Sequence, residues 1–327
     1  MKTSIFITYT CCFTLFWGLL SYKTTAQDIQ YTQFFNSPLY LNPAMTGATE
    51  QWRANLLHRS QWLAIDAQFI STTASVEYNL VPLRSGFGLL LSHDLAGKDR
   101  AVSMSATGSY AFNFQLRNWT FRLGLQGALL QRGNDYMNLV FPSQVLLNEP
   151  PISEAPLVMS RLVMDFSTGI LVHNDKFWVG FAANHLNQPV VGALSVGNAV
   201  LPMKFALHLG ATLPMGSKNY QTYMLPTLLV KMQGTARQFD TGVRFTFDNS
   251  PLIFGAYYRG IPTPTYQDAV AGLIGIRFGD WKCMYSYDLT ISGLTPASGG
   301  SHEIGIVWEM ATKAHKQFYG VNCPVWK

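Results

Sequence analysis

The stretch WTFRLGLQ, Trp119–Gln126, decides the fold of this chain. Its odd positions carry large apolar side chains, whereas its even positions are Thr120, Arg122, Gly124 and Gln126. Because successive side chains of a β-strand point to opposite faces, this segment forms a ribbon with one apolar and one polar face. A buried helix would repeat its apolar positions at a period near 3.6 residues instead.

The same alternation recurs along the whole chain, for example in Met203–Leu213, Leu162–Val172 and Phe239–Phe247. About fourteen segments show it, and most have the length of about eleven residues that a tilted transmembrane strand needs. They lie near residues 52–58, 70–80, 86–94, 100–114, 119–132, 161–173, 176–187, 201–213, 220–233, 237–247, 251–259, 267–278, 281–290 and 302–310.

Charged residues within these segments fall on the polar face, in phase with Arg122. They are Arg53, Glu77, Arg122, Asp165, Lys204, Arg244, Arg277, Lys282, Asp288 and Glu303. A charge on a lipid-facing position costs roughly 2–4 kcal/mol near the membrane midplane, so this segregation is expected if the apolar face meets lipid. Only 13% of the residues are charged, which also disfavours a soluble β-sandwich. We therefore predict an all-β, transmembrane, antiparallel up-and-down β-barrel.

Loop lengths give a second sign of a membrane barrel. Short connections near residues 82–85, 116–118, 174–175, 215–219, 248–250 and 279–280 alternate with longer ones near 59–69, 94–99, 133–160, 186–200, 260–266 and 292–301. The short connection at Gly234 breaks this rule. Short turns are typical of the periplasmic side, so both termini are expected to be periplasmic. The aperiodic connection Gly133–Ser160 is expected to be a functional or plugging loop.

The first 26 residues resemble a secretory signal peptide. Lys2 precedes the apolar run Ile5–Leu20, and small residues end at Ala26. The predicted organisation is a signal peptide (1–26), a periplasmic N-terminal segment (27–51), an outer-membrane barrel (52–310) and a periplasmic tail (311–327). Cleavage leaves Cys283 and Cys323, which are too few for a disulfide framework. The formal net charge of +5 is too weak a bias to indicate a nucleic-acid partner.

Three stretches resemble a known family. They are QDIQYTQFFNSPLYLNPAMTG at Gln27–Gly47, YSYDLTISGLTPASGGSHEIGI at Tyr285–Ile306, and the ending NCPVWK. Together they resemble the PorP/SprF family of type IX secretion system outer-membrane proteins. The resemblance covers essentially the whole mature chain, whereas the barrel strands by themselves are generic.

The resemblance implies a function that the residue pattern does not show. It implies an outer-membrane barrel that supports export and surface attachment of large proteins, adhesins and gliding-type proteins among them, that carry a type B C-terminal signal domain. It also implies periplasmic partners from the secretion motor, beside the outer-membrane lipid. The polar inner face alone would suit another function, that of a passive channel or transporter for small molecules.

The segment with Asn42 and Pro43 stands directly before the first predicted strand. Pro43 forces Asn42 into an extended conformation and excludes a β-ladder there. One interpretation is a simple entry into the strand with a turn at Gly47. The other is a docking segment in the periplasm or the lumen.

Catalysis is not expected. Ser301 and Glu303 share one face of the last predicted strand and His302 lies on the other, so these three residues cannot form a nucleophile–base pair. The sequence holds no metal-binding or nucleotide-binding motif, so we expect no metal and no cofactor.

The polar face provides candidate lumenal or partner-binding residues. With the segments above, the candidates are Asn42, Pro43, Arg122, Asp165, Arg244, Arg277, Asp288, Ser301, His302, Glu303 and Cys323. Two interpretations remain: a network of arginine–carboxylate pairs that plugs the barrel, or a selective aqueous path. On either one, Leu123→Arg on the lipid face should destabilise the barrel, and Gly124→Ser on the inner face should be tolerated.

Overall fold

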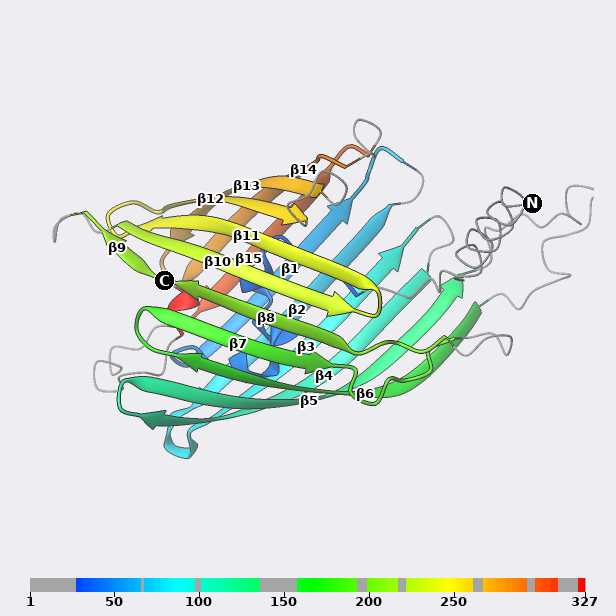
Figure 1. The fold of residues 1–327 in the computed structure, drawn as a ribbon, viewed down its shortest axis with the longest axis horizontal. Helices are drawn as coiled ribbons and strands as arrows, with labels where there is room; N and C mark the ends of the chain where they lie inside the picture. The colour runs from blue at the N-terminus through cyan, green and yellow to red at the C-terminus, as the bar shows by residue number, and fades with distance from the viewer. Residues whose placement is uncertain are drawn as a thin grey trace, which may run out of the picture.

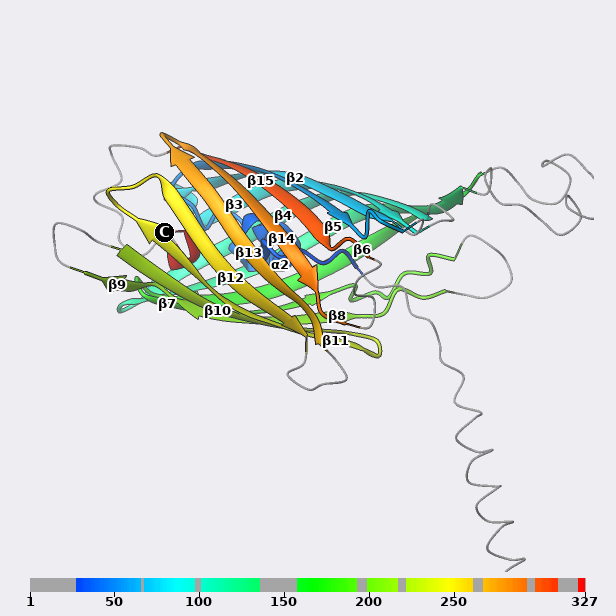
Figure 2. The same ribbon diagram turned by 90° about the horizontal axis from the view of Figure 1, so that it is seen from above.

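The protein is a closed β-barrel with a folded segment inside it, as the computed structural model shows (Figures 1 and 2). The structure describes residues 28–326 except 66–67, 98–100, 136–157, 193–198, 217–221, 261–266, 293–297 and 311–322. The predicted signal peptide and the central part of the predicted plugging loop lie outside the described residues. Within the described part, no helix is long and apolar enough to cross a membrane.

Fifteen labelled strands form the wall. They are β1 (Trp52–Gln61), β2 (Phe69–Leu80), β3 (Ser85–Ala96), β4 (Ala101–Leu116), β5 (Trp119–Asp135), β6 (Val158–His173), β7 (Phe177–Asn184), β8 (Lys204–Ala211), β9 (Leu213–Met215), β10 (Thr222–Gln233), β11 (Ala236–Phe247), β12 (Leu252–Gly260), β13 (Gln267–Phe278), β14 (Trp281–Thr290) and β15 (Ser301–Glu309). β8 and β9 both pair with β10 and are interrupted only at Thr212. Together they act as one strand, so the barrel has fourteen strands.

Neighbouring strands are antiparallel and consecutive, and β1 pairs with β15 to close the barrel. In that closing pair Arg53 lies opposite Glu309 and Arg59 opposite Glu303. Each segment that the sequence predicts as a strand is a strand here, so the predicted barrel is confirmed. β5 and β6 are longer than expected, and the connection between them is residues 136–157 rather than 133–160.

The two faces of the wall divide as the sequence predicts. Leu123, Leu125 and Phe166 on the outer face are each about half exposed or more, whereas Arg122 and Glu303 are fully buried inside. Paired aromatic rings line the outer wall beside the short turns, with Trp52 against Tyr78 and Trp281 against Trp308. Such rings are typical of the membrane–water boundary.

The N-terminal segment departs from the sequence prediction. Residues 28–51 were expected in the periplasm, but η1 (Phe34–Asn36), α2 (Pro38–Leu41) and η2 (Pro43–Met45) lie inside the barrel (Figure 2). Pro38 and Pro43 each begin one of these short helices, where a missing backbone N–H costs nothing. We call residues 28–49 the plug.

The two ends of the described chain lie at opposite mouths, unlike the common periplasmic side that the loop lengths predicted. Asp28 lies at the mouth with the long connections, against His185 and Lys204. Cys323 lies near the mouth with the short turns, where its backbone N–H donates to Ala48. The reason is that the plug runs back through the lumen before β1 begins.

Candidate functional site

The centre of the site is the contact between the plug and the inner wall. Arg122 donates from Nε to the carbonyl of Ala44 at 3.0 Å and from Nη2 to that of Thr46 at 2.5 Å. Gln126, two residues further along β5, donates to the carbonyl of Leu39 at 2.6 Å. One strand therefore supplies donors to three carbonyls of the plug, which would otherwise be buried without partners.

Asn42 and Pro43 are buried in this contact, so the interpretation as a lumenal segment matches their position. Asn42 accepts a hydrogen bond from the backbone N–H of Ala44 at 2.9 Å and caps η2. Its side-chain amide donates to the carbonyl of Ile170 at 3.1 Å and lies 3.0 Å from Nε2 of His208. The predicted turn at Gly47 is also present, with a left-handed φ of 65°.

Glycines on the inner wall make the close approach possible. A methyl group at Gly124 would lie 2.2 Å from the backbone nitrogen of Ala44, and one at Gly86 would lie 2.1 Å from the carbonyl oxygen of Thr46. No side chain fits there unless the plug moves. The expectation that Gly124→Ser is tolerated is therefore wrong for this structure, because the inner wall is packed rather than open.

A buried charge network holds the first turn of the plug. Arg59 contacts Asp288 at 2.8 Å and Glu303 at 2.9 Å, with all three side chains almost fully buried. Glu303 accepts hydrogen bonds from the backbone N–H groups of Thr32 and Gln33. The arginine–carboxylate network that the sequence suggested is present, and it binds the backbone of the plug.

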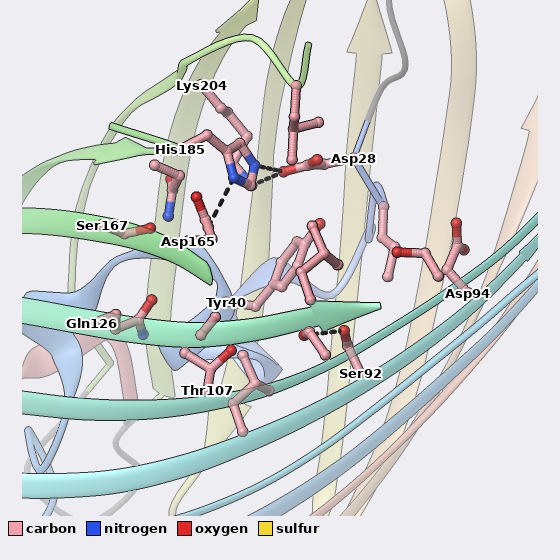
Figure 3. A pocket seen from close by; sticks show the side chains of 18 of the residues that line it. Asp28, Tyr40, Ser92, Asp94, Thr107, Gln126, Asp165, Ser167, His185 and Lys204 are labelled. Atoms are coloured by element: carbon pink, nitrogen blue, oxygen red, sulfur yellow. Dashed lines mark hydrogen bonds and ion pairs between the residues drawn. The ribbon is translucent and has the colours of Figure 1, made fainter. Parts of the chain in front are cut away.

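Asp28 begins the plug within a second cluster of charges (Figure 3). Its carboxylate lies 2.6 Å from Nζ of Lys204 and 2.8 Å from Nε2 of His185, whose Nδ1 lies 2.9 Å from Asp165. Burial lowers the pKa of His185, but Asp28 and Asp165 outweigh this effect and raise it to about 9. Burial raises the pKa of Asp28, but Lys204 and His185 hold it well below its usual value.

Cavities remain above the plug, at the mouth with the long connections. The largest has a volume of about 420 Å³ and is lined by residues such as Arg132, Arg237 and Asp268. A smaller one of about 150 Å³ lies between Lys204, Lys231 and Arg237. Most residues around both spaces are charged or carry amides, and the spaces are large enough for water or a small ligand.

Residues 323–325, near the end of the chain, contact the inner wall and the plug at the other mouth. Arg244 donates to the carbonyl of Val325 at 2.6 Å and lies over the ring of Phe35 at 4.1 Å. Cys323 is 1% exposed, and burial raises the pKa of its thiol to about 12. A thiol in this state is a poor nucleophile, so Cys323, a partner-binding candidate in the sequence, is not suited to form a disulfide with a partner.

Three predicted residues lie outside the plug contacts. Arg277 donates to the carbonyl of Phe247 at the mouth with the short turns. Ser301 is buried on the inner wall, whereas His302 faces outward and lies 2.8 Å from the hydroxyl of Tyr285. The opposite orientation of His302 and Glu303 that the alternation predicts is therefore present.

Sequence reasoning missed the plug residues that bind the network. Thr32 and Gln33 are ordinary polar residues in a segment without periodicity, so no local pattern marks them. His185 lies just after β7 and was assigned to a strand. One signal did exist: many small residues lie on the polar face, and Gly124 and Gly86 are among those that the plug approaches.

Residues 23–308 match the family described as type IX secretion system membrane protein PorP/SprF. The chain belongs to the PorP/SprF family. The match covers most of the chain, and it confirms the resemblance drawn from the terminal motifs. Among curated proteins, none matches this sequence.

A solved transporter structure has a similar barrel fold. The toluene transporter TbuX of Ralstonia pickettii is 10% identical with a TM-score of 0.51, over 84% of this chain and 94% of that one. A FadL homologue of Pseudomonas aeruginosa is 12% identical with a TM-score of 0.47, over 84% and 94%. At such identities the likeness shows the fold alone. The family and the closed barrel make this PorP/SprF chain a multi-pass protein of the outer membrane and of a secretion system, within a family that is not one of enzymes.

Proposed function

We propose that this PorP/SprF barrel is a non-enzymatic accessory of type IX secretion that supports export and surface attachment of large proteins with a type B C-terminal signal domain. The exported proteins that we propose are adhesins and gliding-type proteins. A cleavable signal peptide, residues 1–26, delivers the chain, and components of the secretion motor meet it in the periplasm. The family membership supports the general role, and the geometry of the lumen supports the accessory form of it.

The observation that carries the proposal is the occupied lumen. The plug is tied to the wall by Arg122, Gln126 and Glu303, all buried, and its own apolar side chains pack against the inner wall. The chain end fills the other mouth through Val325. A barrel filled in this way offers its two mouths, rather than its lumen, to partners. Binding residues are usually held on loops above a rigid scaffold, and the long connections have that position.

The test uses two strains. In one, residues 136–157 are replaced by a short Gly-Ser linker. In the other, Lys313, Lys316, Phe318 and Tyr319 of the tail are replaced by serine, and Cys323–Trp326 are kept because Cys323 and Val325 are buried in the barrel. The replaced positions, within 136–157 and 313–319, lie outside the described residues. Heat-modifiable migration on gels checks that each barrel inserts. We expect the adhesin to be lost from the surface in at least one strain. If it reaches and stays on the surface in both, the role assigned to these segments is wrong.

A passive channel is the second candidate, and the polar cavity of about 420 Å³ favours it. The discriminating measurement is single-channel conductance of the purified protein in planar bilayers. We expect the plugged wild-type barrel to be closed and a Gly124→Leu variant, in which the plug is displaced, to conduct. Steady conductance of the wild type would favour the channel and contradict the plugged form of the proposal.

A further inference from the structure

A patch of polar side chains interrupts the apolar outer wall near the mouth with the long connections. Its members are His58 and Ser60 of β1, Thr72 of β2, His93 of β3, Tyr285 and Tyr287 of β14, and His302 of β15. We call these seven residues the outer histidine patch. Arg59 and Glu303, their neighbours in sequence, point into the lumen, so the alternation of the strands turns the patch outward.

The strand register brings these residues together across five adjacent strands. Ser60 lies opposite His302, and His302 opposite Tyr287. Thr72 lies between His58 and His93, opposite both of them in the ladder. Three of the seven histidines in the chain therefore share one region of the outer wall. Such a concentration on a lipid-facing surface is not expected from chance placement, because a polar group in hydrocarbon costs free energy.

The patch is partly organised by its own hydrogen bonds. Nδ1 of His58 lies 2.8 Å from the hydroxyl of Thr72, and Nε2 lies 3.2 Å from that of Ser60. Nδ1 of His302 lies 2.8 Å from the hydroxyl of Tyr285. Among the described residues, neither the ring of His93 nor Nε2 of His302 has a hydrogen-bond partner. The hydrogen bonds fix the rings of His58 and His302. The ring nitrogens of His93 and Nε2 of His302 are left to bind a ligand.

The position of the patch indicates which ligand it meets. Each member occupies one of the three outward-facing positions of its strand that are nearest the mouth with the long connections. Apolar residues such as Leu91 and Ile304, which face hydrocarbon, lie next to them. The polar side chains therefore lie toward the end of the wall, within reach of lipid headgroups, and away from the membrane midplane. No carboxylate occupies an outward-facing position on these five strands, so nothing here repels an anion.

We propose that the outer histidine patch binds the phosphorylated saccharide headgroup of a glycolipid in the outer leaflet. Imidazole and hydroxyl groups donate hydrogen bonds to phosphate and sugar oxygens. The exposed faces of Tyr285 and Tyr287 provide apolar contact for the sugar rings. The inference rests on the orientation that the loop lengths predict, with the long connections outside the cell, and the proposed function rests on the same orientation. It does not depend on the cargo, because no step in it involves an exported protein.

The test measures lipid retention by native mass spectrometry of the purified barrel. The probes are a diphosphorylated disaccharide lipid, the same lipid without phosphate, and phosphatidylglycerol. The variant is His93→Leu with His302→Leu, which places apolar side chains where lipid tolerates them. The control is Tyr258→Phe on β12, which also faces outward near this mouth but lies outside the patch. Heat-modifiable migration confirms that every barrel is folded.

We expect the wild type and the control to retain the diphosphorylated lipid at least about tenfold better than the variant does, since two donors are lost. The wild type should also prefer it to both other lipids. Equal retention by the variant would overturn the proposal, and so would equal binding of the lipid without phosphate. Stronger retention of phosphatidylglycerol would assign the patch to phospholipid and overturn the glycolipid. A photo-crosslinker at residue 93 that captures a protein instead of lipid in cells would also overturn it.

Discussion

Leu123 and Gly124 are neighbours in β5 and lie on opposite faces of the same wall. Leu123 is 47% exposed on the outer face, where hydrocarbon accepts apolar side chains of many sizes but rejects charge. Gly124 faces the plug, where even a methyl group meets the backbone of Ala44. The outer face thus restricts the polarity of a side chain, and the inner face restricts its size. The inner face accepts charge as well, provided that every charge has a partner.

The first prediction concerns charge on the inner face. In Arg59→Met, the carboxylates of Asp288 and Glu303 stay buried and lose one cation, and Arg259, which lies 3.1 Å from Asp288, is the cation that remains. Breaking a buried ion pair in this way costs roughly 3–5 kcal/mol, the largest effect that we expect. Reversible urea unfolding in lipid vesicles measures it. The control is Arg237→Met at the same mouth, where the side chain is exposed and a change within about 0.5 kcal/mol is expected. Similar losses in both variants would contradict the network.

The second prediction concerns charge on the outer face. Leu123→Arg should lower the free energy of unfolding by roughly 2–4 kcal/mol, because the guanidinium lies in hydrocarbon. Leu123→Met keeps the surface apolar and should cost less than about 1.5 kcal/mol. The same urea titration measures both. If arginine and methionine at residue 123 prove equal, this position does not face lipid.

The third prediction concerns size on the inner face. Gly124→Ala should destabilise the barrel by about 1–3 kcal/mol, since the added methyl group overlaps the backbone of the plug. Gly108→Ala, on the outer face of the neighbouring strand β4, is the control, because a methyl group there meets nothing within 4 Å. Thermal unfolding of the two variants in the same detergent gives the comparison. Equal thermal unfolding midpoints would mean that the plug can move away from residue 124 without destabilising the barrel.

The difference between the two faces also explains what the sequence could predict. The lipid penalty acts on every strand alike, so the phase of Arg122, Asp165 and Glu303 is visible in the sequence as a period of two. The position of the plug has no such signature. Its apolar residues, such as Phe34, Phe35 and Leu39, follow no period, which fits a periplasmic segment as well as a lumenal one.

The contacts of the plug were beyond sequence reasoning for a second reason. Asp28 meets Lys204 and Gln233, far along the chain, and only the closed barrel brings them together. The charges on the inner wall were predicted, but their partners were not. A network of arginine–carboxylate pairs was one of two interpretations of the inner face, but Arg244 contacts the carbonyl of Val325 and the ring of Phe35.

The last prediction concerns the Asp28 end of the plug, where the inner face depends on protonation. Because the pKa of His185 is raised to about 9, its charge stabilises the cluster fully below about pH 6.5, and this contribution is lost as pH rises through 9. The shift in the pKa of Asp28 has the opposite sign, so the stability that Asp28 contributes is lost only in acid.

A nitroxide label on Gln30→Cys, in a Cys283→Ala background, should therefore gain mobility between pH 8 and pH 10. The effect should be the smallest of the four, because Lys204 still holds Asp28 at 2.6 Å. His185→Gln keeps a hydrogen-bonding side chain without the charge and should abolish the alkaline step. If that step persists in His185→Gln, His185 does not anchor the plug. Lys204 is then the cation that allows the buried carboxylate of Asp28 at this mouth.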